Sequence, residues 1–162
     1  MSIKVFKKTR FIVTMFLVVW ILCPVPSYAD GLRTGFGKVI LENVPKGKEY
    51  SMRRDSKFPL IIENESDRTV ELKIEVLVPE GEEIQEGYEA IPDADWITLE
   101  KEIFIIGPRA EAETDVMIHV PDDDDYLGRR FHVFIWSYTI GEAIGLGIKS
   151  KLLFNIGRPD EE

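Results

Sequence analysis

Apolar and polar residues alternate along much of the chain after Gly35. In the clearest stretch, residues 69–78, five apolar residues share one parity: Val70, Leu72, Ile74, Val76 and Val78, of which the charged residues Glu71, Lys73 and Glu75 separate the first four. Successive side chains of a β-strand point to opposite faces, so this stretch predicts a strand with one face in a core and the other in water. A helix would scatter the same five residues around its circumference.

Similar stretches predict seven further strands, at residues 38–42, 58–62, 96–99, 103–106, 115–120, 131–140 and 146–156. Turn-forming residues separate several of them, as at Asn64–Asp67 and Gly107-Pro108. Residues 131–140 are apolar at both parities, which is typical of a central strand covered on both sides or of a strand with an apolar outer face. The longest connection, 79–95, is predicted to be a surface loop with room for a short edge strand.

No stretch predicts a stable helix, since the Ala- and Glu-rich segment 108–114 is too short to hold one alone. Short strands at regular spacing, without helices to connect parallel neighbours, predict an all-β fold. We expect a single antiparallel β-sandwich of about seven to eight strands. A small barrel is the alternative, because the same alternation serves both architectures.

The first 29 residues have the three-part layout of a secretory signal peptide. Four basic residues lie among the first ten, the uncharged run 11–23 follows, and the triplet Ser27-Tyr28-Ala29 places small residues at both ends. We expect cleavage after Ala29, which leaves one domain at 30–157 and a polar tail at 158–162.

The apolar run within this segment is shorter than the roughly 20 residues that cross a bilayer, so we expect no stable membrane span after cleavage. Two alternatives stay open. One is a retained N-terminal anchor, and the other is a lipid-modified Cys23, which the bulky Leu22 before it disfavours. The chain is therefore expected to be exported, to the periplasm or to the extracellular medium.

Charge and cysteine content narrow the possible partners. The chain has 20 Lys and Arg against 29 Asp and Glu. Without the four basic residues of the signal peptide, 16 basic residues face 29 acidic ones, a formal charge of −13. This charge argues against nucleic acid and against anionic lipid as partners. Cys23 is the only cysteine, so the cleaved protein has no disulfide and depends on its core alone.

The most distinctive candidate site is an aromatic row in the predicted strand 131–140. Phe134, Trp136 and Tyr138 share one face of that strand with His132, while Phe131, Val133 and Ile135 occupy the other. One of the two sets must face the core. If the Phe131 set faces inward, the Trp136 set is an apolar outer patch, and such patches mark interaction sites.

Motifs that would carry catalysis are absent from the sequence. It has no Gly-x-Ser-x-Gly and no His-Glu-x-x-His, and His119 and His132 are its two histidines. We therefore expect no enzymatic activity, no cofactor and no metal. The acidic run Asp122–Asp125 is the one candidate for calcium, but an ordered calcium-loop motif is missing and a solvated turn is the favoured interpretation.

Three segments resemble the immunoglobulin-like β-sandwich modules of bacterial envelope and secreted proteins. They are the strand and Asn-x-Ser-Asp hairpin at 57–67, the strand and loop at 118–128, and the strand 131–138 with the hairpin strand after it. The resemblance implies a scaffold for adhesion, assembly or ligand binding. It also implies that Tyr126 is a structural corner tyrosine, whose ring covers the core edge while its hydroxyl bonds to upstream backbone.

The sequence thus predicts an exported, non-enzymatic interaction module that binds another envelope or secreted protein, with Phe134, Trp136 and Tyr138 as its contact residues. The alternative is a carbohydrate-binding or adhesin module that uses aromatic stacking, with or without calcium. A third option is a chaperone or subunit of surface-fibre assembly, which would pair an exposed strand edge with another chain. The length of the chain suits one domain, whereas such chaperones place their anchoring residues between two.

Overall fold

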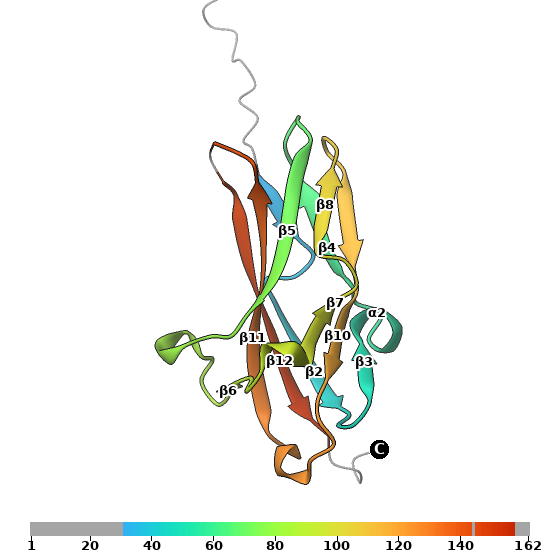
Figure 1. The fold of residues 1–162 in the computed structure, drawn as a ribbon, viewed down its shortest axis with the longest axis vertical. Coiled ribbons are helices and arrows are strands. Elements are labelled where there is room, and N and C mark those ends of the chain that lie inside the picture. The colour runs from blue at the N-terminus through green and yellow to red at the C-terminus, as the bar shows by residue number, and fades with distance from the viewer. Residues whose placement is uncertain (1–30, 144, 158–162) are drawn as a thin grey trace, which may run out of the picture.

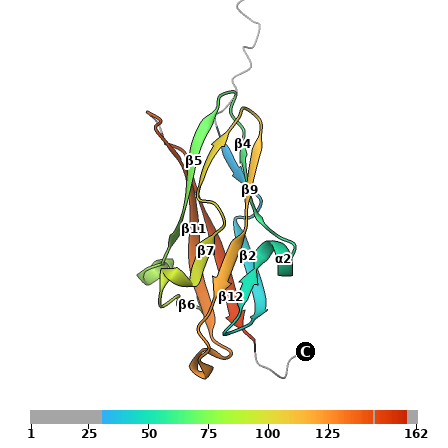
Figure 2. The same cartoon turned by 45° about the vertical axis from the view of Figure 1, so that its right-hand side comes forward.

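The computed structural model describes residues 31–143 and 145–157. The predicted signal peptide (1–29) and polar tail (158–162) lie outside the described residues. Strands run along the long axis of the molecule in two facing layers, which confirms the predicted all-β sandwich (Figures 1 and 2). No helix among the described residues is long and apolar enough to cross a bilayer.

The first layer is built around one long central strand and has the order β2-β12-β11-β5-β8. Its members are β2 (Lys38–Val44), β12 (Gly147–Ile156), β11 (Arg130–Ile140), β5 (Val70–Leu77) and β8 (Ile103–Ile106). The central strand β11 pairs antiparallel with β12 and with β5. Two pairings are parallel: β2 with β12, and the two-residue strand β6 (Glu89–Ala90) with the beginning of β11.

The second layer consists of two three-stranded antiparallel sheets. One contains β1 (Leu32–Thr34), β4 (Leu60–Asn64) and β9 (Glu111–Thr114), and the other β3 (Glu49–Ser51), β10 (Val116–His119) and β7 (Ile97–Leu99). Only Asp115 separates β9 from β10. In contrast, β7 and β8 belong to different layers, so the chain crosses the sandwich between Leu99 and Ile103.

Helical structure is confined to short turns at the ends of strands. They are α2 (Met52–Asp55) and three 3-10 turns: η1 (Gly81–Glu83), η2 (Ala94–Trp96) and η3 (Asp124–Tyr126). Ser51 caps α2, since its side-chain oxygen accepts a hydrogen bond from the Arg54 N–H at 2.9 Å.

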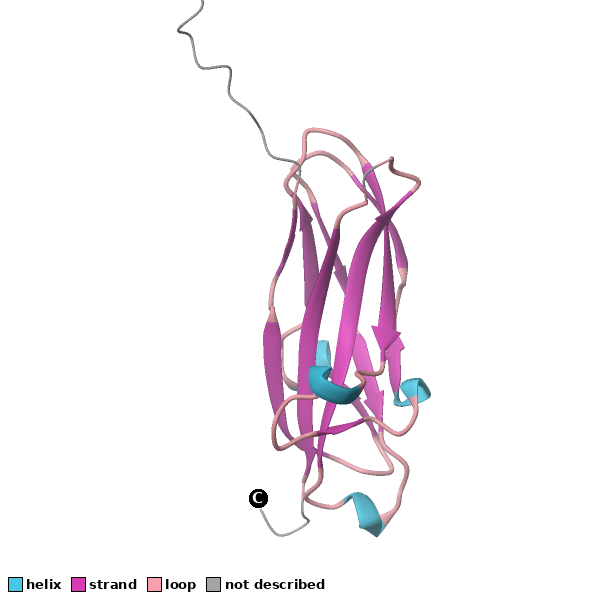
Figure 3. Ribbon diagram, turned by 90° about the vertical axis from the view of Figure 1, so that its left-hand side faces the viewer, coloured by secondary structure: helices cyan, strands magenta, loops and turns pink. Residues whose placement is uncertain are grey.

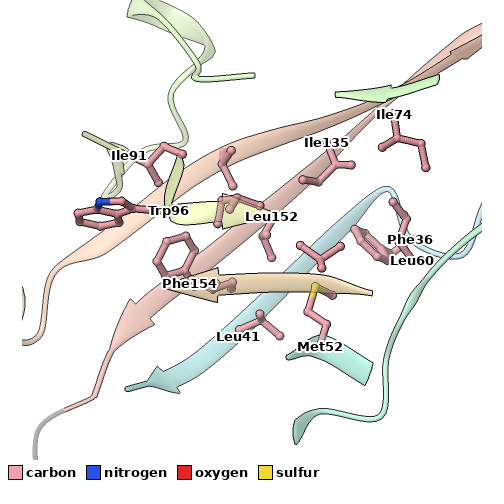
Figure 4. Close-up of a cluster of buried hydrophobic side chains, with 14 of the residues drawn as sticks. Phe36, Leu41, Met52, Leu60, Ile74, Ile91, Trp96, Ile135, Leu152 and Phe154 are labelled. Atoms are coloured by element: carbon pink, nitrogen blue, oxygen red, sulfur yellow. The ribbon is translucent and has the colours of Figure 1, made fainter. Parts of the chain in front are cut away.

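A single hydrophobic core joins the two layers (Figure 4). Phe131 and Phe154, from adjacent strands of the first layer, are fully buried with their ring centroids 5.6 Å apart. Trp96 packs edge-on against Phe131 at 5.3 Å, and Met52 of α2 closes the core near Leu41. The core therefore holds together elements that are far apart in the sequence.

All eight predicted strands are present, with ends that differ by one or two residues. Two residues expected on core faces are exposed instead: Phe58 precedes β4, and Val78 follows the end of β5. The pattern did not predict β1, β3, β9 or α2, which are three or four residues long. Such short elements carry too few positions for a period to be recognised.

Candidate functional site

One face of β11 lies in the core, and the other face lies outside it. Phe131, Val133 and Ile135 are fully buried and face the core between the layers. His132, Phe134, Trp136 and Tyr138 therefore lie on the outer face of the sheet. This answers the question that the sequence left open about which side of this strand is the core.

Half of this outer row is nevertheless buried. His132 is fully buried and Phe134 nearly so, although both point away from the core of the sandwich. The residues that follow β5 fold back over them, and we call residues 79–91 the cover segment. Figure 3 shows its short helical turn, η1, in front of the strands.

The cover segment is attached to the sheet at several points. The pairing of β6 with β11 places Ala90 beside His132, and Ile91 N–H donates to the His132 carbonyl oxygen at 3.3 Å. Glu89 forms an ion pair with Arg129, and Glu83 forms one with Lys149 at 3.2 Å. Ile91 is itself buried in the core, so the segment is anchored at its far end.

His132 joins the cover segment to the sheet through its imidazole. Its Nδ1 accepts a hydrogen bond from the Gln85 N–H at 3.2 Å, which requires that Nδ1 carries no proton and that the imidazole is neutral. Its Nε2 is buried, and no hydrogen-bond partner for it exists among the described residues. Burial is the main reason that the pKa of His132 is lowered, and the positive charges of Lys151 and Lys38 add to this effect, while Glu83 opposes it.

Trp136 and Tyr138 lie beyond the cover segment and are half-buried. Their rings are stacked, with centroids 4.4 Å apart and planes inclined by 28°. We call this pair the aromatic platform. Gly147 is paired with Tyr138, and a β-carbon there would lie only 2.9 Å from the Trp136 Nε1, so glycine leaves room for the indole.

Charged side chains border the aromatic platform. Lys73 and Glu75 of β5 form an ion pair at 2.6 Å. Hydrogen bonds from Lys73 and from Tyr138 hold the pKa of Glu75 below its usual value. On the other side, the Lys149 ammonium lies 4.7 Å from the centre of the Phe134 ring. The arrangement combines two aromatic rings with charged hydrogen-bond donors and acceptors beside them.

Tyr126, the candidate corner tyrosine, lies in η3 and is half-buried. Its ring packs edge-on against Trp96 at 4.9 Å and against Phe131 at 6.1 Å. The ring thus covers one end of the core. Its hydroxyl makes no hydrogen bond with the described residues, so packing is the contact that the structure shows for this residue.

The acidic run Asp122–Asp125 is held by protein groups. Lys46 forms ion pairs with Asp122 and with Asp124, the latter at 2.8 Å, and its hydrogen bond to Asp122 lowers the pKa of that carboxyl. Asp123 accepts a hydrogen bond from the Asp125 N–H at 2.9 Å and so caps η3. Within residues 31–143 and 145–157 no group of acidic, His or Cys side chains is arranged to hold a metal ion.

The structure contains two buried polar networks that the sequence pattern did not predict. The Asn64 amide donates to the carbonyl oxygens of Arg68, Ile106 and Gly107, which ties the β4–β5 hairpin to the β8–β9 turn. The Asp115 carboxylate accepts hydrogen bonds from the Ser51 hydroxyl and the Arg53 N–H, which ties α2 to the β9–β10 junction. The Asn-x-Ser-Asp turn was a signal for the first network, since Asn64 Oδ1 also accepts from the Ser66 hydroxyl.

Comparisons with known proteins define the fold. No protein-family model matches the sequence, and no curated protein sequence matches it. The structure is similar to a PapD-like domain of human CEP192, with a TM-score of 0.58 and 10% identity over 83% of this chain and 90% of that domain.

Two bacterial proteins are also similar in structure. The Escherichia coli chaperone DraB has a TM-score of 0.51 and 12% identity over 78% of this chain and 55% of its own. A Bacteroides ovatus protein described as a candidate carbohydrate binder has a TM-score of 0.56 and 10% identity, over 79% of this chain and 37% of its own. The chain thus spans little more than half of the chaperone, and at such identities the likeness concerns the fold alone, an immunoglobulin-like β-sandwich.

Proposed function

We propose that this chain is an exported, non-enzymatic interaction module that binds another protein of the envelope or the extracellular medium. The signal-peptide pattern of the first 29 residues supports export. The observation that carries the binding role is the aromatic platform, because Trp136 and Tyr138 remain partly exposed on a sheet face where His132 and Phe134 are buried.

The aromatic platform is better suited to binding a protein than the rest of the sheet. Tyrosine and tryptophan supply large contact areas at low cost in side-chain entropy and are enriched where proteins bind one another. The neighbouring Lys73, Glu75 and Lys149 provide a polar rim of the kind that surrounds such contacts.

A capture experiment tests the proposal. The exported protein and its Trp136→Ala/Tyr138→Ala variant are immobilised and exposed to envelope and culture-medium fractions of the producing cells. We expect a partner that the wild type retains and the double variant loses, while Ile40→Ala, at another exposed apolar residue of the same sheet, retains it. Equal recovery by the double variant would place the binding site elsewhere.

A carbohydrate ligand is the second candidate, and a specific observation favours it. The aromatic platform combines two partly exposed rings with charged hydrogen-bonding groups beside them, which suits the apolar face and the hydroxyls of a sugar ring. A glycan array separates the two candidates: retention of an oligosaccharide by the wild type and its loss in Trp136→Ala would favour the sugar.

A further inference from the structure

Strand β8 ends the first layer with an unpaired edge. It pairs with β5 through Lys73–Ile103 to Val70–Ile106, and no other strand of the described residues pairs with it. Beyond this register, Ile74 N–H donates to the Glu102 carbonyl oxygen at 2.8 Å. Alternate residues of an antiparallel strand bond to the same neighbour, so Phe104 and Ile106 also face β5. The N–H and C=O groups of Ile103 and Ile105 therefore point away from the sheet.

The side chains at this edge are apolar and open to solvent. Ile103 is 47% exposed and Ile105 is 78% exposed, while Phe104 and Ile106 between and after them are buried in the core. Natural proteins protect free edges with charges, proline or bulges within the strand, and β8 has none of these over Ile103–Ile106. The opposite edge strand, β2, carries Lys38 and Glu42 and has an irregular register near its end.

The charges beside the β8 edge are mainly acidic. Glu71 lies opposite Ile105 in the register, and Glu102 immediately precedes the strand; neither forms an ion pair with a described residue. Glu102 also lines an open hollow of about 560 Å³ between β5 and β7, together with Asp95 and with Glu75, which is paired with Lys73. An approaching segment would meet the unpaired carboxylates of Glu71 and Glu102, together with one cation, Lys101, whose ammonium lies 4.8 Å from the centre of the Phe104 ring.

We propose that β8 accepts an extended segment of another protein as an additional strand, apolar at alternate positions and basic at its ends. The backbone groups of Ile103 and Ile105 would bond to the added strand, and its apolar side chains would cover the two isoleucines. The acidic residues around β8 favour basic residues at the ends of the added strand. They also disfavour a second copy of this chain, which would bring the same carboxylates to the contact and, without the predicted signal peptide, a formal charge of −13.

This site is distinct from the aromatic platform, so the two can be tested separately. The probe is the peptide acetyl-Lys-Val-Thr-Val-Thr-Val-Lys-amide, titrated into the isotope-labelled exported protein while backbone amide signals are followed by NMR. We expect the amide signals of Ile103 and Ile105 to shift. A peptide with Glu in place of both Lys should bind at least tenfold more weakly because it adds negative charge to an acidic edge.

Substitutions in β8 test whether it is the strand that binds the peptide. Ile105→Pro removes an N–H that β5 does not use, so the sheet should persist while the Ile103 response is lost. Ile105→Lys keeps the N–H but adds a charge that protects the edge, so it should weaken peptide binding. This variant provides the test if the proline variant fails to fold. Ile40→Lys, at the exposed isoleucine of the opposite edge, should leave binding within twofold of the wild type.

Three results would overturn the proposal. One is the absence of any shift at Ile103 and Ile105 at millimolar peptide. Another is a set of shifts centred on Trp136 and Tyr138, which would assign the peptide to the aromatic platform. The third is a shift of the β8 amides with protein concentration alone, which would identify a second copy of the chain as the occupant.

Discussion

At the scale of single residues, His132 is the clearest case of a side chain whose surroundings change its chemistry. It stands on the outer face of the sheet, yet it is fully buried and accepts a hydrogen bond from Gln85 through Nδ1. Protonation would turn this acceptor into a donor that faces another donor, in a site that solvates charge poorly. The cover segment is thus joined to the sheet by a group that must stay neutral.

This predicts a pH dependence of stability with a definite sign. The pKa of His132 is lowered in the folded protein, so the unfolded chain takes up the proton first, below about 6.5. Stability is therefore present above that pH and decreases as the pH falls below it. Urea unfolding at pH 7.5 and pH 5.5 should show a smaller difference for His132→Gln than for the wild type.

The second histidine provides the matched control. His119 is exposed, so His119→Gln should keep the pH dependence of the wild type. If both variants retain the full difference, carboxylates rather than His132 cause the loss of stability in acid.

Gly147 allows the aromatic platform to be disturbed without removing it. A methyl group at Gly147→Ala would lie 2.9 Å from the Trp136 Nε1 and would displace the indole. We expect a changed Trp136 fluorescence spectrum and at least tenfold weaker partner or glycan binding, because the two rings would no longer stack. Gly37→Ala, whose β-carbon would meet no atom within 4 Å, should change neither measurement.

At the scale of elements, the β4–β5 hairpin depends on one buried amide. Asn64 donates to the Ile106 and Gly107 carbonyl oxygens at 3.2 and 2.9 Å, so it joins two connections of the chain. In Asn64→Ala these acceptors lose their donor, and we expect the free energy of unfolding to fall by roughly 1–3 kcal/mol. Asp67→Ala, in the same turn but with an exposed ion pair to Arg109, should cost less than about 1 kcal/mol in urea titrations.

Elements differ in how far the sequence predicted them. Strands such as β5 and β11 were predictable because they have enough residues for a period of two to be evident. The helix α2 was not, since its four residues depend on Ser51 and on Asp115, which lies 64 positions away from that serine. Long-range hydrogen bonds of this kind leave no local pattern.

The candidate site was predictable only in part, for a related reason. The alternation along β11 placed His132, Phe134, Trp136 and Tyr138 on one face, and the structure agrees. Residues 79–91 cover His132 and Phe134 but leave Trp136 partly exposed. This outcome depends on where the polar segment folds back, and its Glu- and Gly-rich sequence does not specify the position. Phe134 is thus an unsuitable contact residue in the described state, because it is buried.

At the scale of the whole molecule, one core spans both layers, so unfolding should be cooperative. Phe131→Ala removes a fully buried ring that contacts Trp96 and Phe154, and we expect a loss of about 3–5 kcal/mol. Phe58→Ala, at an aromatic residue that is 43% exposed, should cost clearly less. Urea unfolding followed by circular dichroism and by tryptophan fluorescence should give coincident transitions, and separate transitions would indicate two independent cores.

The parallel contact between β2 and β12 ties residues 38–44 to residues 151–156, at opposite ends of the domain. Such pairing between distant segments raises the contact order of the first layer, and a high contact order is associated with slow folding. A chain that threads through a secretion pore in sequence order cannot complete this sheet until its last strand emerges. Under the proposed export, this topology delays completion of the sheet until passage is over.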